Sequence, residues 1–167
     1  MSTKNLTSQE ALEKMTALIK SIKTAMLLTD LKKQPPISAI PMTTKEVDEE
    51  GDIWFLSGLK SEHNINIVKN PQVQLLYSNP SGMEFISIYG MATVITDKEK
   101  LKNLYTNSDD AWFEGEDDPN LTAIKITPKE AYYWDNKQNK YVSLFKMGLA
   151  AATGNKADVG EKGKLNL

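Results

Sequence analysis

The spacing of hydrophobic positions changes along this chain from a helical period to a strand period. Over residues 7–23, hydrophobic side chains recur every three or four positions, as they do on one face of a helix. Thr7 and Glu10 have the spacing of an N-terminal capping box. The segment is expected to be an amphipathic helix packed on the core.

The following segments have the pattern of β-strands. Short runs rich in β-branched and aromatic residues are separated by turn residues. We expect strands over residues 24–31, 37–43, 52–57, 73–78, 84–96 and 121–134. Pro41 favours a sheet edge or a bulge because proline cannot donate to the ladder. Gly90 indicates a bulge in the long fifth strand.

Three further helices are expected between or after these strands, over residues 61–69, 97–105 and 141–153. In the first of them, Ser61 is the expected N-cap, and Ile65 and Val68 are expected on the inner face. The segment after Gly154 is polar and rich in glycine, so weak order is expected there.

This order of elements predicts a mainly β protein with peripheral helices. Short connections favour antiparallel pairing. Six strands in a chain of this size predict a closed or partly closed antiparallel barrel, since closure removes exposed sheet edges. We expect residues 1–153 to form a single domain and residues 154–167 to form a polar C-terminal tail.

Composition and charge narrow the function classes. The net charge is −2 and the pI is about 5.5, which argues against a nucleic-acid binder. No segment has the length and hydrophobicity of a membrane span, and the N-terminus is polar, so a cytoplasmic protein without a membrane partner is expected.

The residue types that are missing exclude several chemistries. Without cysteine, thiol nucleophiles and thiolate metal sites are excluded, and the single histidine, His63, excludes sites that need several imidazoles. No metal site is expected. All 20 basic residues are lysines, so no guanidinium is present to clamp a phosphate.

The junction between the third strand and the next helix is a candidate anion site. Ser57, Lys60, Ser61 and His63 lie around the expected helix N-terminus, where free N–H groups and the helix dipole favour an anion. The alternative is an ordinary serine N-cap with solvated Lys60 and His63.

Two aromatic clusters also need an explanation. Trp112 and Phe113 lie in the acidic loop 108–119, whose spacing does not fit an EF-hand calcium site. They contact a ligand or a partner, or they pack under their own loop. In the run YYWD at residues 132–135, alternation turns Tyr133 away from its two aromatic neighbours, which favours packing in the core or between subunits.

Three motifs carry a resemblance to a known family. They are the run IPM at residues 40–42 before an acidic glycine turn, the run WFLS at 54–57 before a helix from Ser61 to the NP pair at 70–71, and the run WFEGEDDP at 112–119 before EAYYWD at 130–135. Over about residues 11–153, the chain resembles the FMN-binding split-barrel proteins, the pyridoxamine 5′-phosphate oxidase-like superfamily. The last motif resembles the general stress protein 26 branch.

The resemblance implies a six-stranded split β-barrel, a homodimer, and FMN, with FAD as an alternative, in a cleft at the subunit interface. The flavin-binding positions that it implies are Ile40, Pro41, Met42, Phe55, Ser57, Lys60, Ser61, His63, Trp112 and Phe113. The branch commonly has Arg in place of Ile40 and Lys in place of His63, so two permanent cations are missing from this chain.

The resemblance therefore implies a flavin-binding protein of the general stress type, acting as a flavin-dependent oxidoreductase on an unidentified substrate. No side chain is assigned as a catalytic acid or base. Two alternatives remain open: a non-catalytic flavin carrier or sensor in a stress response, and a ligand-free dimeric scaffold that binds a protein partner.

Overall fold

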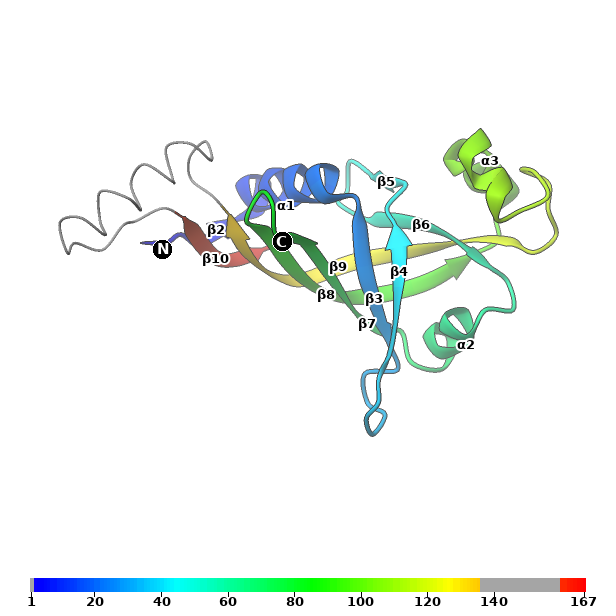
Figure 1. Ribbon diagram of the computed structural model, residues 1–167, viewed down its shortest axis with the longest axis horizontal. Helices are drawn as coiled ribbons and strands as arrows, with labels where there is room; N and C mark the ends of the chain where they lie inside the picture. The colour runs from blue at the N-terminus through cyan, green and yellow to red at the C-terminus, as the bar shows by residue number, and fades with distance from the viewer. Residues whose placement is uncertain (1, 136–159) are drawn as a thin grey trace.

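The computed structural model describes residues 2–135 and 160–167 (Figure 1). The chain is mainly β, with few helices. The helices are α1 (Ser8–Ile22), α2 (Glu62–Lys69), α3 (Lys98–Leu104) and the 3-10 helix η1 (Asn107–Ala111). The predicted helix over residues 141–153 lies outside the described residues. Among the helices described, none is both long enough and apolar enough to cross a membrane.

The strands form one mixed sheet. They are β1 (Ser2–Thr3), β2 (Leu6–Thr7), β3 (Thr24–Thr29), β4 (Ser38–Thr43), β5 (Glu46–Val47), β6 (Ile53–Gly58), β7 (Gln72–Asn79), β8 (Glu84–Ile95), β9 (Leu121–Asp135) and β10 (Glu161–Asn166). Their order is β1-β10-β9-β8-β7-β3-β4, and β6 pairs with β9 and β5.

The six predicted strands correspond to β3, β4 and β6 to β9, and their positions are confirmed. The prediction of only six, all antiparallel, is wrong, because the described residues contain ten strands and both β1 and β2 pair with β10 in parallel. Three of the additional strands have two residues each, too few to produce an alternating pattern.

The sheet is not closed in the described part of the chain. There, β4 pairs only with β3, and no pairing joins β4 to β6. The edge position predicted from Pro41 is therefore confirmed. The bulge predicted near Gly90 is also confirmed, since the register between β8 and β9 shifts between Tyr89 and Gly90.

The weak order expected after Gly154 is wrong for β10. This strand pairs antiparallel with β9, from Glu161 opposite Asp135 to Leu165 opposite Ala131. Gly163 fits only because it has no side chain: an added Cβ would lie 1.9 Å from the Lys4 carbonyl oxygen. The segment is polar because, among residues 161–166, only Gly163 and Leu165 are buried.

Helix α1 covers one face of the sheet, as expected (Figure 1). Its buried residues are Ala11, Met15, Leu18 and Ile19, which belong to the main hydrophobic core. The expected capping box is not formed, because Thr7 makes no side-chain hydrogen bond at this helix end.

The inner face of α2 differs from the prediction. Ser61 is the N-cap, as expected, and its hydroxyl accepts the Asn64 N–H. The buried residues, however, are Asn64 and Ile67, while Ile65 is 46% exposed and Val68 77% exposed. The prediction selected the apolar side chains, but the helix turns a hydrogen-bonded asparagine toward the protein.

Candidate functional site

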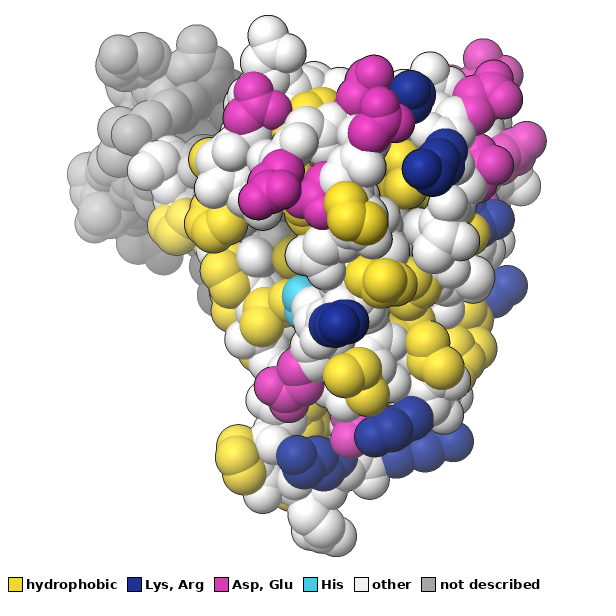
Figure 2. All heavy atoms as spheres, turned by 90° about the vertical axis from the view of Figure 1, so that its right-hand side faces the viewer, with side chains coloured by type: hydrophobic (Ala, Val, Ile, Leu, Met, Phe, Trp, Pro, Cys, Tyr) yellow, Lys and Arg dark blue, Asp and Glu magenta, His cyan; other side chains and the backbone are white. Residues whose placement is uncertain are grey.

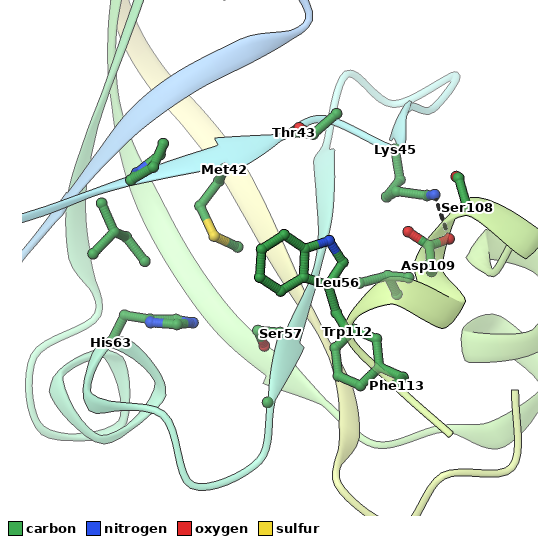
Figure 3. A pocket seen from close by; sticks show the side chains of 13 residues that line it. Met42, Thr43, Lys45, Leu56, Ser57, His63, Ser108, Asp109, Trp112 and Phe113 are labelled. Carbon is green, nitrogen blue, oxygen red and sulfur yellow. Dashed lines mark hydrogen bonds and ion pairs between the residues drawn. The ribbon is translucent and has the colours of Figure 1, made fainter. Parts of the chain in front are cut away.

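A cavity of about 500 Å³ lies between β4 and β6 and is bordered by α2 and η1 (Figure 3). The structure brings together these predicted site residues in its lining: Ile40, Pro41, Met42, Ser57, His63, Trp112 and Phe113. They come from β4, β6, α2 and the segment that follows η1. The open side of the sheet therefore coincides with the predicted site.

Three predicted site residues lie outside this lining. Phe55 is completely buried in the main core, because both faces of β6 are covered at this point, and its neighbour Leu56 lines the cavity instead. Lys60 is exposed in the turn before α2. Ser61 caps the helix next to the cavity.

Sequence reasoning missed several lining residues. These are Thr43, Lys45, Leu56, Gly58, Ser108 and Asp109. Each is within four residues in sequence of a predicted residue, so the motifs located the segments that line this cavity. The side-chain contact between Lys45 and Asp109 joins segments 64 residues apart, and no local spacing signals it.

The free edge of β4 presents backbone groups to the cavity. Thr44 donates its N–H to the carbonyl of Lys23 opposite it, at 2.8 Å. Bonded and non-bonded pairs alternate in an antiparallel ladder, so Met42 also points its backbone groups toward β3. Pro41 and Thr43 therefore point theirs away from β3, and both line the cavity. Thr43 offers an N–H there, which Pro41 lacks.

The corner between β6 and α2 is held by a buried polar network. Ser57 donates from Oγ to Oδ1 of Asn64 at 3.0 Å. Asn64 Nδ2 donates to the Gly58 carbonyl at 2.9 Å and to Thr122 Oγ1 at 3.0 Å. Thr122 Oγ1 also lies 2.8 Å from Ser57 Oγ. The Ser57 hydroxyl is thus used within the protein, and it positions the N-terminus of α2.

His63 points its ring into the cavity from the first turn of α2 (Figure 3). Its Nε2 atom is buried and has no hydrogen-bond partner among the described residues. Burial lowers the pKa of His63 below 6.5, and the Glu62 carboxylate opposes this in part. The imidazole is therefore mainly neutral at pH 7, and its buried Nε2 atom is left without a hydrogen-bond partner in the described part of the chain.

The sequence left two roles open for the aromatic pair after η1, which were contact with a ligand or partner and packing under the loop. Phe113 is partly buried and packs against the smaller hydrophobic cluster that includes Leu101 and Leu104. Trp112 is 82% exposed and lines the cavity. The alternation predicted at the end of β9 is confirmed, since Tyr133 is fully buried and Tyr132 is 50% exposed.

Seen from its α2 and α3 side, the protein carries its charge unevenly (Figure 2). Acidic side chains gather in the upper part of this face, and several lysines lie at its lower end. The imidazole lies between hydrophobic side chains in the middle. The cavity region is thus mainly apolar, with charges of both signs around it.

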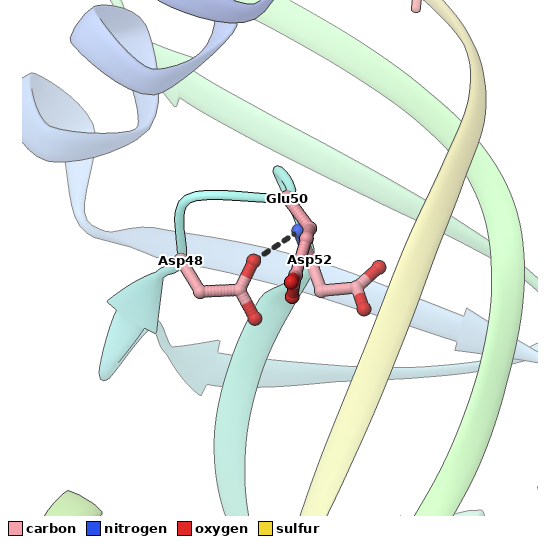
Figure 4. A group of neighbouring side chains, drawn as sticks. All are labelled: Asp48, Glu50 and Asp52. Carbon is pink, nitrogen blue, oxygen red and sulfur yellow. Dashed lines mark hydrogen bonds between the residues drawn. The ribbon is translucent and has the colours of Figure 1, made fainter.

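A second group of carboxylates lies in the β5–β6 hairpin (Figure 4), where oxygens of Asp48, Glu50 and Asp52 come within 4.8 Å of one another. Asp48 accepts hydrogen bonds from the Asp52 N–H at 2.8 Å and from Trp54 Nε1 at 2.7 Å. Asp52 pairs with Lys125 Nζ at 3.1 Å. These bonds hold Asp48 and Asp52 within the hairpin, and we assign no metal site to the group.

Comparisons with known proteins agree with this fold. The family described as Pyridoxamine 5'-phosphate oxidase like matches residues 10–158. General stress protein 26 of Bacillus subtilis (strain 168) is 27% identical over 81 residues, which are 47% of this chain and 58% of that protein. The match thus spans less than two thirds of that relative.

Solved structures extend the likeness over most of the chain. The general stress FMN/FAD binding protein from Xanthomonas citri is 29% identical, with a TM-score of 0.66 over 79% of this chain and 93% of that chain. General Stress Protein 26 from Bacillus anthracis str. Sterne is 25% identical, with a TM-score of 0.65 over 75% and 94%. A Jannaschia sp. CCS1 protein shares the fold at a TM-score of 0.78 and 20% identity, over 96% of this chain and 100% of that chain. This chain therefore belongs to the pyridoxamine 5′-phosphate oxidase-like family, in the general stress protein 26 branch.

Proposed function

We propose that the cavity binds FMN, with FAD as an alternative, and that the protein is a flavin-dependent oxidoreductase of the general stress type. The observation that carries this proposal is one cavity that joins the unpaired edge of β4 to the N-terminal turn of α2. Its volume of about 500 Å³ is within the usual range of cofactor sites. The relative from Xanthomonas citri named as an FMN/FAD binding protein supports the choice of ligand.

The β4 edge suits the flavin ring. Met42 and Ile40 supply apolar contact area, and the outward backbone of Pro41 and Thr43 supplies a row of hydrogen-bonding groups. A planar heterocycle with polar atoms along one edge matches such a strand edge. A bound ring would also cover these groups from water.

The α2 end suits the phosphate. The N–H groups of Glu62 and His63 lie in the first helical turn, where they have no intrahelical partner, and the helix dipole favours an anion there. The orphaned Nε2 atom of His63 gains a partner if a phosphate oxygen binds beside it. The residues present therefore fit a phosphate without arginine.

When bound, the flavin would supply the electron or hydride transfer. The residues of this chain would then bind it, orient it and exclude water from its ring.

We further propose that two chains form a homodimer with the flavin at their interface. Directly opposite residues in the register form a row across the sheet: Pro41, Met26, Leu76, Ser87 and Tyr132. Met26 is 40% exposed, Leu76 41% and Tyr132 50%. Exposed apolar rows of this kind favour association, and this row ends at Pro41 in the cavity lining. The gap between β4 and β6 would be the split of the predicted barrel.

The proposal is tested by purifying the full chain and recording its visible spectrum, followed by mass analysis of any released small molecule. We expect FMN, reducible by NADH or NADPH and reoxidised by an added electron acceptor. Flavin without turnover would favour the carrier alternative. A chain that neither contains nor binds FMN, FAD or riboflavin would overturn the proposal.

Replacing Ser61 by Ala is expected to weaken FMN binding about tenfold, because the helix cap and a hydroxyl near the phosphate are both lost. Riboflavin, which lacks the phosphate, should bind the variant and the wild type equally. The matched control is Asp97→Ala, which removes the N-cap of α3 instead. Fluorescence titration of both flavins measures these affinities. An equal loss for riboflavin would contradict the placement of the phosphate.

FMN affinity is expected to rise as the pH falls from 8 to 6.5, by about threefold. Burial lowers the pKa of His63 in the free protein, whereas a phosphate beside Nε2 would stabilise the imidazolium and raise that pKa. Binding then takes up a proton. Titrations at several pH values, with riboflavin and with His63→Gln as controls, measure the effect. Riboflavin binding should be independent of pH, and the His63→Gln variant should gain no FMN affinity as the pH falls, because the phosphate itself takes up protons at about pH 6. A wild type that gains no affinity either would contradict the assignment.

A further inference from the structure

An ion pair joins the connection between β4 and β5 to η1 across the cavity rim. Lys45 Nζ lies 2.6 Å from Asp109 Oδ2 and 3.1 Å from Thr106 Oγ1, and the dashed line in Figure 3 marks the first contact. The side chains of Lys45 and Asp109 are only 14% and 15% exposed, and both residues line the cavity. A pair this sheltered is screened less than a surface pair.

Asp109 also fixes the chain that follows it. Its carbonyl oxygen accepts the N–H groups of Trp112 at 2.9 Å and Phe113 at 3.1 Å. Its carboxylate accepts the Thr106 N–H at 2.8 Å, which closes the capping box of η1. The position of Trp112 therefore depends on where the Asp109 residue is held.

Trp112 has no packing role that explains its place. Phe113 anchors the segment on the smaller cluster, but Trp112 is 82% exposed. Its indole nevertheless extends over the cavity opposite Met42 (Figure 3). An exposed indole held over an apolar cavity is suited to contact with the face of a planar ligand.

We propose that the Lys45–Asp109 ion pair is a positioning device, which holds Trp112 over the cavity as a stacking platform for the ring of the bound flavin. This inference rests on the proposed function, because it assigns the ring end of the ligand to the η1 side. Lys45 and Asp109 are positioning residues and act through Trp112. The phosphate end remains at α2.

The charge state of the pair fits this role. Burial alone would raise the pKa of Asp109, but hydrogen bonds from Lys45 and Thr106 outweigh it and bring the pKa below the usual 3.8. The carboxylate therefore stays ionised throughout the neutral range, and the pair persists at any pH at which the ligand would be measured.

The same acidic loop makes a surface ion-pair contact with helix α3, which serves as a matched control. Lys102 lies 3.5 Å from Glu116 and 3.3 Å from Asp117, but its side chain is 45% exposed and it does not line the cavity. Lys102→Met therefore removes an ion pair from the acidic loop without touching the proposed device. We expect it to bind FMN and riboflavin like the wild type.

The test is titration of the full-length chain with FMN and with riboflavin. Trp112→Ala should weaken both flavins about fivefold, because ring stacking is lost and the phosphate is unaffected. Lys45→Met and Asp109→Asn should weaken both about threefold, and Asp109→Glu should recover most of the loss. In the Trp112→Ala background, Asp109→Asn should add less than about 1.5-fold.

Each outcome decides between the alternatives. Equal losses from Asp109→Asn with and without Trp112 would overturn the inference, since a merely structural role would not depend on the indole. If the wild type binds flavin and the Asp109→Asn variant binds it equally well, the inference is overturned, but the proposed function is unaffected. If the wild type binds neither flavin, the proposed function fails, and the inference falls with it.

Discussion

Replacing Asn64 by Leu is expected to lower the free energy of unfolding by about 3 kcal/mol and to abolish tight FMN binding. Asn64 is only 2% exposed, and its amide bonds to Ser57, Gly58 and Thr122. Leucine has a similar volume but can form none of these bonds. It would remove three buried hydrogen bonds at about 1 kcal/mol each. The Ser57 and Thr122 hydroxyls would keep each other, and the Gly58 carbonyl would keep the Ser61 N–H.

Denaturant unfolding and FMN titration measure the two effects separately. The matched control is Asn66→Leu, the same substitution two positions later, where the amide makes one hydrogen bond, to Thr29 Oγ1 at 3.1 Å. We expect this control to lose about 1 kcal/mol and to keep FMN binding. An Asn64→Leu variant as stable as the control would show that the network contributes little to the α2 corner.

Ser57→Ala separates the two possible roles of the serine. Within the network the hydroxyl bonds to Asn64 and Thr122, so the variant should lose about 1 kcal/mol and bind FMN within about threefold of the wild type. A large loss of affinity at unchanged stability would instead place Ser57 in direct contact with the phosphate. Ser61 and Ser57 thus differ in expected effect, although they looked equivalent in the sequence.

The positions of the longer strands could be predicted from the sequence, because each has enough residues for its strand pattern to be recognised. It failed at β10, where Gly163 and Leu165 are the buried residues of a polar strand. It also failed on the inner face of α2, where hydrophobicity pointed to Ile65 and Val68. There the buried position belongs to Asn64, whose partners lie up to 58 residues away.

The candidate site was predicted in its segments but not in its contacts. The motifs around Ile40, Ser57 and Trp112 do meet in one cavity. The Lys45–Asp109 pair and the Asn64 network depend on which segments the sheet brings together, and no spacing within one segment reveals them. The sequence also did not indicate which of the two neighbouring aromatic residues is exposed. The structure shows that Phe113 packs on the smaller cluster and that Trp112 is exposed.

Replacing Leu76 by Lys is expected to convert the proposed dimer to a monomer and to weaken FMN binding by about 100-fold or more. Leu76 lies at the centre of the exposed row, between Met26 and Ser87 in the register. A lysine there would bring two like charges close together, or would bury them without partners, in an interface between two identical sheets. Light scattering during gel filtration and FMN titration measure the two losses.

The control for this charge is Val68→Lys, on the exposed side of α2, where the side chain is 77% exposed and lies outside the apolar row. It should leave both mass and affinity unchanged. The two measurements are coupled by the position of Pro41, which belongs both to the row and to the cavity lining. A monomeric Leu76→Lys variant that still binds FMN tightly would therefore place the whole binding site within one chain, and a wild type that is monomeric at micromolar concentration would reject the dimer.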